Sequence, residues 1–182
     1  MWLPLLIIFS LAISPTRSNT NFIYKSCHTT LYPELCYLYL SRFTTRIGTS
    51  PRLLAQTALA ATLSNTWSTS KKLVTYSRTH KMTRREISAM KDCLEELGDS
   101  AYELHISMVE MGKVRSGSDF LFNMNSIETW VSAALTDDDT CIDGFSDKNM
   151  NVEVKTMVRK HVLNIAHLAS IALAFVNNYA KG

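Results

Sequence analysis

Residues 129–145, with the sequence TWVSAALTDDDTCIDGF, join an apolar helical stripe to an acidic end that carries a cysteine. Counting back from Cys141 in alternate steps of three and four residues follows one face of a helix. The pattern therefore predicts one long helix whose Cys141 sulfur faces a neighbouring helix. The other residues on this face are Asp138, Ala134, Val131, Ile127, Met124 and Phe120.

The expected neighbour is the helix around Cys93, in residues 91–104, KDCLEELGDSAYEL. Its apolar heptad is the most regular in the sequence, and Cys93 flanks it, so a disulfide to Cys141 could cross between the helices. Leu94 and Leu104 lie in the middle of this heptad and are expected to be fully buried. The heptad consists of Ile87, Met90, Leu94, Leu97, Ala101, Leu104, Met108 and Met111.

The composition suits one helical domain without a nucleic-acid partner. The chain has 182 residues, of which 46% are hydrophobic, and it contains only 6 glycines and 4 prolines. So few turn-forming residues favour helices over a β-sandwich. The formal charge is +3, and no basic run exceeds two residues, as in Lys71-Lys72 and Arg84-Arg85. Such pairs are typical of solvated helix faces, so nucleic-acid binding is not expected.

Two apolar stretches are long enough to be weighed as membrane segments. Residues 2–13 are apolar and are followed by small and polar residues, which predicts a secretory signal peptide, residues 1–18, cut after Ser18. A membrane anchor needs roughly 20 apolar residues, more than this stretch provides. Residues 165–176 contain His167 and Ser170 and fit a buried helix face. The protein is therefore expected to be secreted and not bound to a membrane.

Four cysteines in a secreted protein indicate disulfides, and three pairings are possible. Proximity favours Cys27 with Cys36, which leaves Cys93 for Cys141. A zinc site is the competing interpretation, but the sequence has no CxxC pair and the spacings are irregular. The shorter disulfide would close a small helical hairpin, with one helix over residues 21–26 and a second beginning near Pro33.

Four long helices are expected after this hairpin. Ser50 caps the first, Thr83 and Glu86 form a capping box for the second, and Ser118 or Asp119 caps the third. Short connections make such helices antiparallel neighbours. The predicted fold is all-α: an up-down-up-down four-helix bundle over residues 50–180 with an N-terminal disulfide-linked helical hairpin over 21–47, within one domain of residues 19–182. The four helices are expected at 52–80, 83–111, 118–143 and 152–179.

The residues that could carry chemistry do not assemble a recognisable site. Asp137, Asp138, Asp139 and Asp143 lack calcium-loop spacing, and a solvated acidic end or a partner-facing patch is expected there. The five histidines are scattered, and no GxSxG, HExxH or phosphate-binding glycine loop occurs. We therefore expect a binding protein that is not an enzyme, with no cofactor, no metal and no small-molecule substrate.

Three segments together resemble the plant invertase and pectin methylesterase inhibitor family: CHTTLYPELC, DCLEELGDSAYEL and TWVSAALTDDDTCIDGF. The resemblance covers residues 23–179, with four cysteines in the family's order, and implies a helical bundle that inhibits a cell-wall enzyme by docking over its active-site cleft. The last two segments are closer to the pectin methylesterase branch, although Leu97 stands where many members have Tyr. The Pro-Lys-Phe motif of the invertase branch is absent, so acid invertase is the alternative target.

The resemblance also implies where the target binds. The Thr immediately before the fourth cysteine contacts the target in this family, and Thr140 matches it. If Cys141 points inward, Thr140 can face outward together with Thr136 and Asp137. These three residues are the predicted contact surface of a protein secreted to the apoplast and cell wall. The alternative is that Thr140 only bonds to a carbonyl of its own helix. No esterase domain is expected to follow, because the sequence ends at Gly182.

Overall fold

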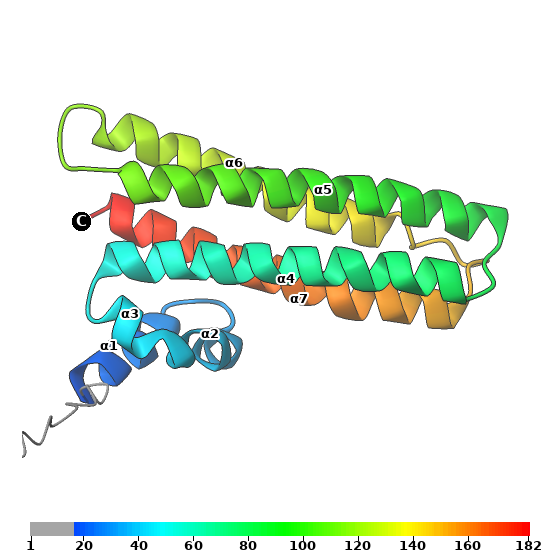
Figure 1. The fold of residues 1–182 in the computed structure, drawn as a ribbon, viewed down its shortest axis with the longest axis horizontal. Coiled ribbons are helices and arrows are strands. Elements are labelled where there is room, and N and C mark those ends of the chain that lie inside the picture. Colours follow the sequence, from blue (N-terminus) through cyan, green and yellow to red (C-terminus); the bar gives the residue numbers. More distant parts are fainter. Residues whose placement is uncertain (1–16) are drawn as a thin grey trace, which may run out of the picture.

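The structure is a computed structural model in which residues 17–182 are described; the predicted signal peptide lies outside them apart from Arg17 and Ser18. The described part is helical throughout, without a strand (Figure 1). Its elements are α1 (Arg17–Cys27), α2 (Pro33–Leu40), the 3-10 turn η1 (Ser41–Phe43), α3 (Thr44–Ile47), α4 (Pro51–Thr79), α5 (Arg84–Lys113), α6 (Phe120–Asp143) and α7 (Val152–Ala180).

Helices α4 to α7 form the predicted up-down-up-down bundle. Each helix packs against two others, in the ring α4, α5, α6, α7. Figure 1 shows α5 and α6 along one side of the bundle and α4 and α7 along the other. The predicted fold is therefore confirmed, and the bundle has two distinct sides, one made by each of these helix pairs.

The N-terminal helices α1, α2 and α3 lie on the α4/α7 side, at the end of the bundle where the chain terminates (Figure 1). A disulfide joins Cys27 to Cys36, whose Cα atoms are 5.5 Å apart. The hydroxyl of Tyr39 donates to Asn65 Oδ1 on α4 and accepts from Asn164 Nδ2 on α7, both at 3.2 Å. The hairpin is thus fixed to one side of the bundle, which leaves the α5/α6 side uncovered.

Helix starts follow the predicted caps in two of three cases. The Ser50 hydroxyl accepts from the Leu53 amide at 3.3 Å at the start of α4. Glu86 and Thr83 form the capping box of α5, and Glu86 also accepts from the backbone amide of Asn151, at 2.7 Å. Asp119 precedes α6, but its side chain makes no capping bond, because its backbone (φ −92°, ψ 1°) is not in the extended conformation typical of a capping residue. Its carboxylate accepts from the Ser118 hydroxyl.

The first helix begins earlier than predicted, at Arg17 and not at residue 21. Residues 17–20 are polar and carry no apolar period, so the sequence pattern gave no sign of helix there. The apolar side chains that hold α1 in place are Ile23 and Cys27, both buried. The predicted start was set by the position of the first apolar residue. The helix begins about one turn before the predicted start.

The buried face of α5 is rotated relative to the predicted heptad. Cys93, Leu97 and Leu104 lie at its centre with at most 1% of their surface exposed, whereas Ile87 is 56% exposed and Leu94 is only partly buried. Successive residues of a helix are about 100° apart, so Leu94 stands at the edge of a face centred on Cys93. The prediction of full burial was right for Leu104 and wrong for Leu94, because the disulfide to α6 turns Cys93 inward.

Helix α7 is long and apolar enough to cross a membrane by length and composition, the one such helix among residues 17–182. In the bundle it is a core helix, with Val158, Ile165 and Ala172 fully buried against its neighbours. The predicted assignment of residues 165–176 to a buried helix face agrees with this packing.

Candidate functional site

The seam between α5 and α6 is joined covalently near one end of the bundle. Cys93 and Cys141 form a disulfide with their Cα atoms 4.2 Å apart, and both residues are buried. All four cysteines are therefore in disulfides, which excludes the zinc interpretation. A cross-link between neighbouring helices restricts their sliding and rotation, so side chains beside the disulfide keep a fixed spacing.

Thr136 and Thr140 lie on the outer surface of α6, as predicted from the inward position of Cys141. Both are exposed. The Thr140 hydroxyl donates to the Thr136 carbonyl at 2.8 Å, and the Thr136 hydroxyl donates to the Ser132 carbonyl at 3.1 Å. Hydroxyls bonded to the preceding turn have their donor already used. What this surface offers a partner is small side chains with methyl groups and free acceptor lone pairs.

Asp137 lies between these threonines and the α5 helix, partly buried, with its carboxyl group within hydrogen-bond reach of Glu103. Burial, then the charge of Asp137 and the hydrogen bond to it, raise the pKa of Glu103 to about 7. Burial also raises the pKa of Asp137, although the bond with Glu103 acts against this rise. Two carboxyl groups so close share a proton at acidic pH, which joins α5 to α6 a second time.

Asp138 departs from the predicted solvated acidic end. Its side chain is fully buried, and its Oδ1 accepts from the Ser100 hydroxyl at 3.1 Å, while Oδ2 has no partner. Burial raises the pKa of Asp138 to about 8, against the effect of the Ser100 bond. The inward stripe of α6 had already included Asp138, so its helical position predicted burial better than its chemistry did. Asp139 and Asp143 are exposed, as expected.

A row of carboxylates on α5 borders the same surface. Burial, followed by the charges of Asp137, Asp99, Glu95 and Asp92, raises the pKa of Glu96. Within residues 17–182 the ion pairs are Arg85 with Asp147 and Lys113 with Glu110, so none of these carboxylates is in an ion pair. Sequence reasoning missed Glu96 and Glu103, although residues 92, 96, 99 and 103 recur at helical spacing.

The surface is hollowed beside Thr140. A groove of about 440 Å³ runs between α5 and α6 over the disulfide, with Asp92 and Glu96 on one wall and Thr140 and Asp143 on the other. The three predicted contact residues are thus placed on one side of the molecule, at the joined seam of two helices. We name this region, formed by Thr136, Asp137, Thr140 and the α5 carboxylates, the α5/α6 face.

His167 and the two tryptophans of the described residues lie outside this face. His167 on α7 stacks on Tyr32 of the hairpin, with ring centroids 3.8 Å apart. Trp130 is partly buried against the core, whereas Trp67 is 57% exposed on α4. None of these residues belongs to the α5/α6 face.

Comparisons with known proteins agree with this architecture. Residues 21–175 match the family described as plant invertase/pectin methylesterase inhibitor. Pectinesterase inhibitor 9 of Arabidopsis thaliana is 41% identical over 98% of this chain and 91% of its own length. Pectinesterase inhibitor 10 of the same plant is 43% identical over 91% of this chain, which spans about half of that relative (53%). The 21 kDa protein of Daucus carota is 40% identical over 96% of this chain and 91% of its own length.

Solved structures show the same fold. A mutant form of a pectin methylesterase inhibitor from Arabidopsis superimposes with a TM-score of 0.67 at 24% identity, covering 88% of this chain and 96% of that one. The family consists of inhibitor proteins, which agrees with the prediction of a protein that is not an enzyme. On the extent of the family match and the identity to its relatives, the chain belongs to the plant invertase/pectin methylesterase inhibitor family.

Proposed function

We propose that the protein is a secreted inhibitor of pectin methylesterase that places its α5/α6 face over the active-site cleft of the enzyme. The observation that carries the proposal is the exposure of Thr136 and Thr140 beside the Cys93–Cys141 disulfide. The names of three relatives that are 41–43% identical support this enzyme as the target, because they are pectinesterase inhibitors. Pectin methylesterase rather than acid invertase is therefore the proposed target.

The physical suitability of this face lies in its rigidity and its small side chains. Binding loses free energy when interface side chains must be ordered, and a surface that is already fixed avoids much of that loss. Thr136 and Thr140 have no long flexible groups, and their hydroxyls are held by their own helix. The wall of a cleft can therefore approach the backbone of α6 closely.

Asp137 and Glu103 add polarity to the same contact. The Oδ2 atom of Asp137 and the Oε2 atom of Glu103 are buried, and the two carboxyl groups lie within hydrogen-bond reach of each other. An oxygen buried against the neighbouring carboxyl group is out of reach of a bound enzyme, so the other carboxyl oxygen of Asp137, Oδ1, is the atom that could meet a donor. Asp137 is thus proposed to accept a hydrogen bond from the target, while the threonines supply the close contact.

Substitution of Thr140 by Trp tests this surface. Thr140→Trp is expected to abolish inhibition by steric exclusion from the cleft, because an indole at the seam holds the two surfaces apart. Thermal stability should stay close to that of wild type, since exposed positions are typically worth within about ±0.5 kcal/mol. Thr156→Trp is the matched control, because Thr156 is exposed on α7, outside the α5/α6 face. Equal inhibition by both variants and wild type would place the interface on another face.

The choice of target is tested by titrating the purified protein against a plant pectin methylesterase and a plant acid invertase in parallel. Inhibition of the esterase is the expected result. Inhibition of invertase alone would refute the proposed target and leave the assignment to the family unchanged.

Secretion to the apoplast is part of the same proposal and rests on the predicted signal peptide, residues 1–18. Protein recovered from cell-wall fluid is expected to begin near Asn19. Recovery of the chain only from the cell interior, with Met1 retained, would contradict it.

A further inference from the structure

Charge is divided between the two sides of the bundle. Helix α4 carries four cationic side chains and no carboxylate, and α7 carries three cationic side chains and one carboxylate. Helix α6 has five carboxylates and no cation, while α5 has seven carboxylates against four cations. The net charge of +3 is therefore unevenly distributed over the bundle. The side made by α5 and α6, which includes the α5/α6 face, is acidic, and the side made by α4 and α7 is basic.

The basic side contains a groove of about 530 Å³ between α4 and α7. Lys71 and Lys72 lie on its α4 wall and His161 on its α7 wall. Lys160 precedes His161 in the sequence and its charge acts on the His161 ring. Neither Lys71 nor Lys72 forms an ion pair within residues 17–182. Burial, then the charges of Lys72 and Lys160, lower the pKa of His161. Positive groups from both helices thus act on one opening without a carboxylate between them.

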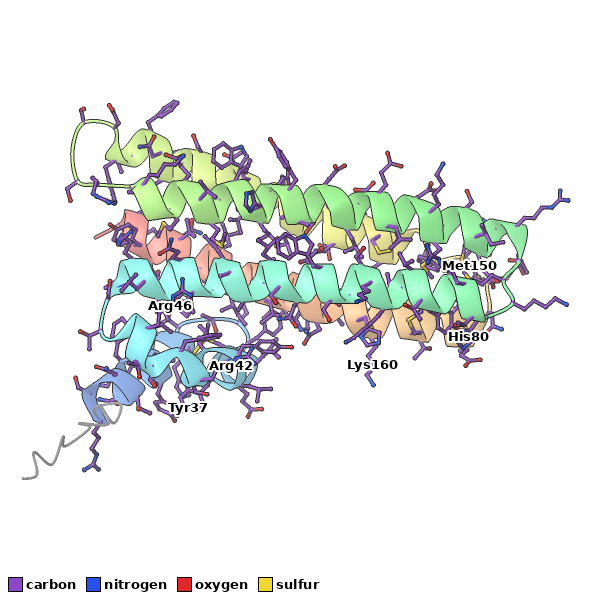
Figure 2. All side chains as sticks on the ribbon, viewed as in Figure 1. Tyr37, Arg42, Arg46, His80, Met150 and Lys160 are labelled. Carbon is purple, nitrogen blue, oxygen red and sulfur yellow. A yellow bond between two sulfur atoms is a disulfide. The ribbon has the colours of Figure 1, made fainter. Side chains whose placement is uncertain are left out.

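A fixed aromatic surface forms one end of this groove. The rings of Tyr76 and His80 stack with centroids 3.9 Å apart and planes inclined by 13°. The His80 ring nitrogen Nδ1 lies 2.9 Å from the Thr79 hydroxyl and 3.2 Å from the Tyr76 carbonyl, so its orientation is set. Figure 2 shows His80 at the end of α4 and Lys160 pointing away from α7, on the same side of the bundle.

Hydroxyl groups complete the lining. Ser68, Thr75 and Thr79 face the groove, and the threonine hydroxyls donate to their own helix, which leaves their oxygens able to accept. The charges of the Glu153 and Glu86 carboxylates act on Tyr76, at the His80 end of the groove. Cations in the middle and an aromatic surface at one end are a combination suited to a ligand that is both anionic and ring-shaped.

We propose that the α4/α7 groove binds a carboxylated oligosaccharide of the uronate type, separately from the α5/α6 face. Lysine ammonium groups bind carboxylates by charge-assisted hydrogen bonds. The stacked rings of Tyr76 and His80 offer apolar area to the C–H face of a sugar ring, and the hydroxyls can exchange hydrogen bonds with those of the sugar. The volume of the groove falls within the range usual for small-ligand sites, roughly 300 to 1,000 Å³.

The choice of uronate over other acidic sugars rests on the proposed function. Removal of a methyl ester from pectin leaves a free carboxylate on that sugar, so the product of the enzyme proposed as the target is a chain of this kind. Because the groove and the α5/α6 face lie on opposite helix pairs, one molecule can hold a de-esterified chain while its other side faces an enzyme. The groove would retain the inhibitor where de-esterified pectin accumulates.

The experiment is a calorimetric titration of the purified protein with a defined oligogalacturonate at low ionic strength. Binding is expected, and Lys71→Gln combined with Lys72→Gln should weaken it by about tenfold or more, because two charge-assisted contacts are lost. His80→Ala should weaken it by about threefold, since part of the stacking surface is removed. The control pair is Lys25→Gln with Lys91→Gln, which removes the same charge from exposed sites on α1 and α5 and should leave affinity within about twofold.

Four results would overturn the proposal. These are the absence of binding, an equal loss of affinity in the groove and control pairs, unchanged affinity of the His80 variant, and binding of inorganic polyphosphate or of the fully methyl-esterified oligomer as tightly as the oligogalacturonate. Inhibition of pectin methylesterase by the lysine variant is measured alongside and is expected to be unchanged. Failure of both wild type and variant to inhibit the esterase would refute the proposed function. The titration would still show whether the groove binds the oligogalacturonate.

Discussion

Replacing Asp138 by Asn should make the protein more stable, and increasingly so as the pH rises. Asp138 is fully buried, and the Ser100 hydroxyl donates to its Oδ1, a bond that an amide oxygen can also accept. Burial raises the pKa of the carboxyl to about 8, whereas an aspartate in an unfolded chain titrates near 4. The folded protein therefore keeps a proton on Asp138 over a pH range in which the unfolded chain has released it.

The sign and the size follow from this difference. A carboxyl group with a raised pKa destabilises the fold progressively as the pH rises from the unfolded value to the folded value. At about 1.4 kcal/mol per pH unit, the loss relative to a neutral group is about 1.5 kcal/mol at pH 5 and about 5 kcal/mol at pH 7.5. Asp138→Asn has no charge to bury, so its advantage over wild type should grow by about 3 kcal/mol between these two pH values.

The assay is denaturant unfolding of both proteins at several pH values, with the disulfides intact. Any fixed cost of burying the amide is the same at each pH, so the slope of the difference is what matters. Asp139→Asn serves as the control, because it removes one charge from an exposed neighbour and should shift stability by at most about 0.5 kcal/mol. A difference between Asp138→Asn and wild type that does not change from pH 5 to pH 7.5 would refute the reasoning.

Two further predictions concern the core and the cross-links. Leu104→Ala should cost about 2 to 5 kcal/mol of unfolding free energy, because Leu104 is fully buried. Leu94→Ala should cost clearly less, because Leu94 is only partly buried. Equal losses in thermal melts would contradict the rotated face of α5. Peptide mapping without reduction should recover Cys27 with Cys36 and Cys93 with Cys141, and removal of the second bond by Cys93→Ala with Cys141→Ala should cost about 4 kcal/mol for a sequence separation of 48; a crossed pairing would refute the predicted connectivity.

The arrangement of the helices was predictable because each has a regular apolar period and a recognisable beginning. The stripe that ends at Cys141 and the capping box at Thr83 and Glu86 both recur in the structure as the sequence predicted. The rotation of α5 was not predictable, because Ile87 and Leu94 fit a heptad as well as Cys93 does. Only the position of the partner helix decides which of two overlapping stripes is buried.

The candidate site was predictable in part, for a similar reason. Thr140 and Thr136 could be placed outside because Cys141 was placed inside, which is a local argument along one helix. The approach of Glu103 to Asp137 depends on the register between α5 and α6, and a single helix carries no information about that register. The basic groove was not predicted, because the sequence alone indicates only that Lys71 and Lys72 are a solvated pair. The fold brings His161 and the charge of Lys160 on α7 close to them.

Glu86 joins two connections that are far apart in the sequence. Its carboxylate accepts from the amides of Thr83 and Asn151, so one side chain closes the entry to α5 and the entry to α7 together. These two bonds lower the pKa of Glu86, and the bond from Asn151 has the larger effect. Glu86 therefore stays charged until the pH falls below the usual carboxyl range. Fraying at one entry removes a bond that also holds the other, so we expect the two connections at this end of the molecule to open as a single cooperative unit.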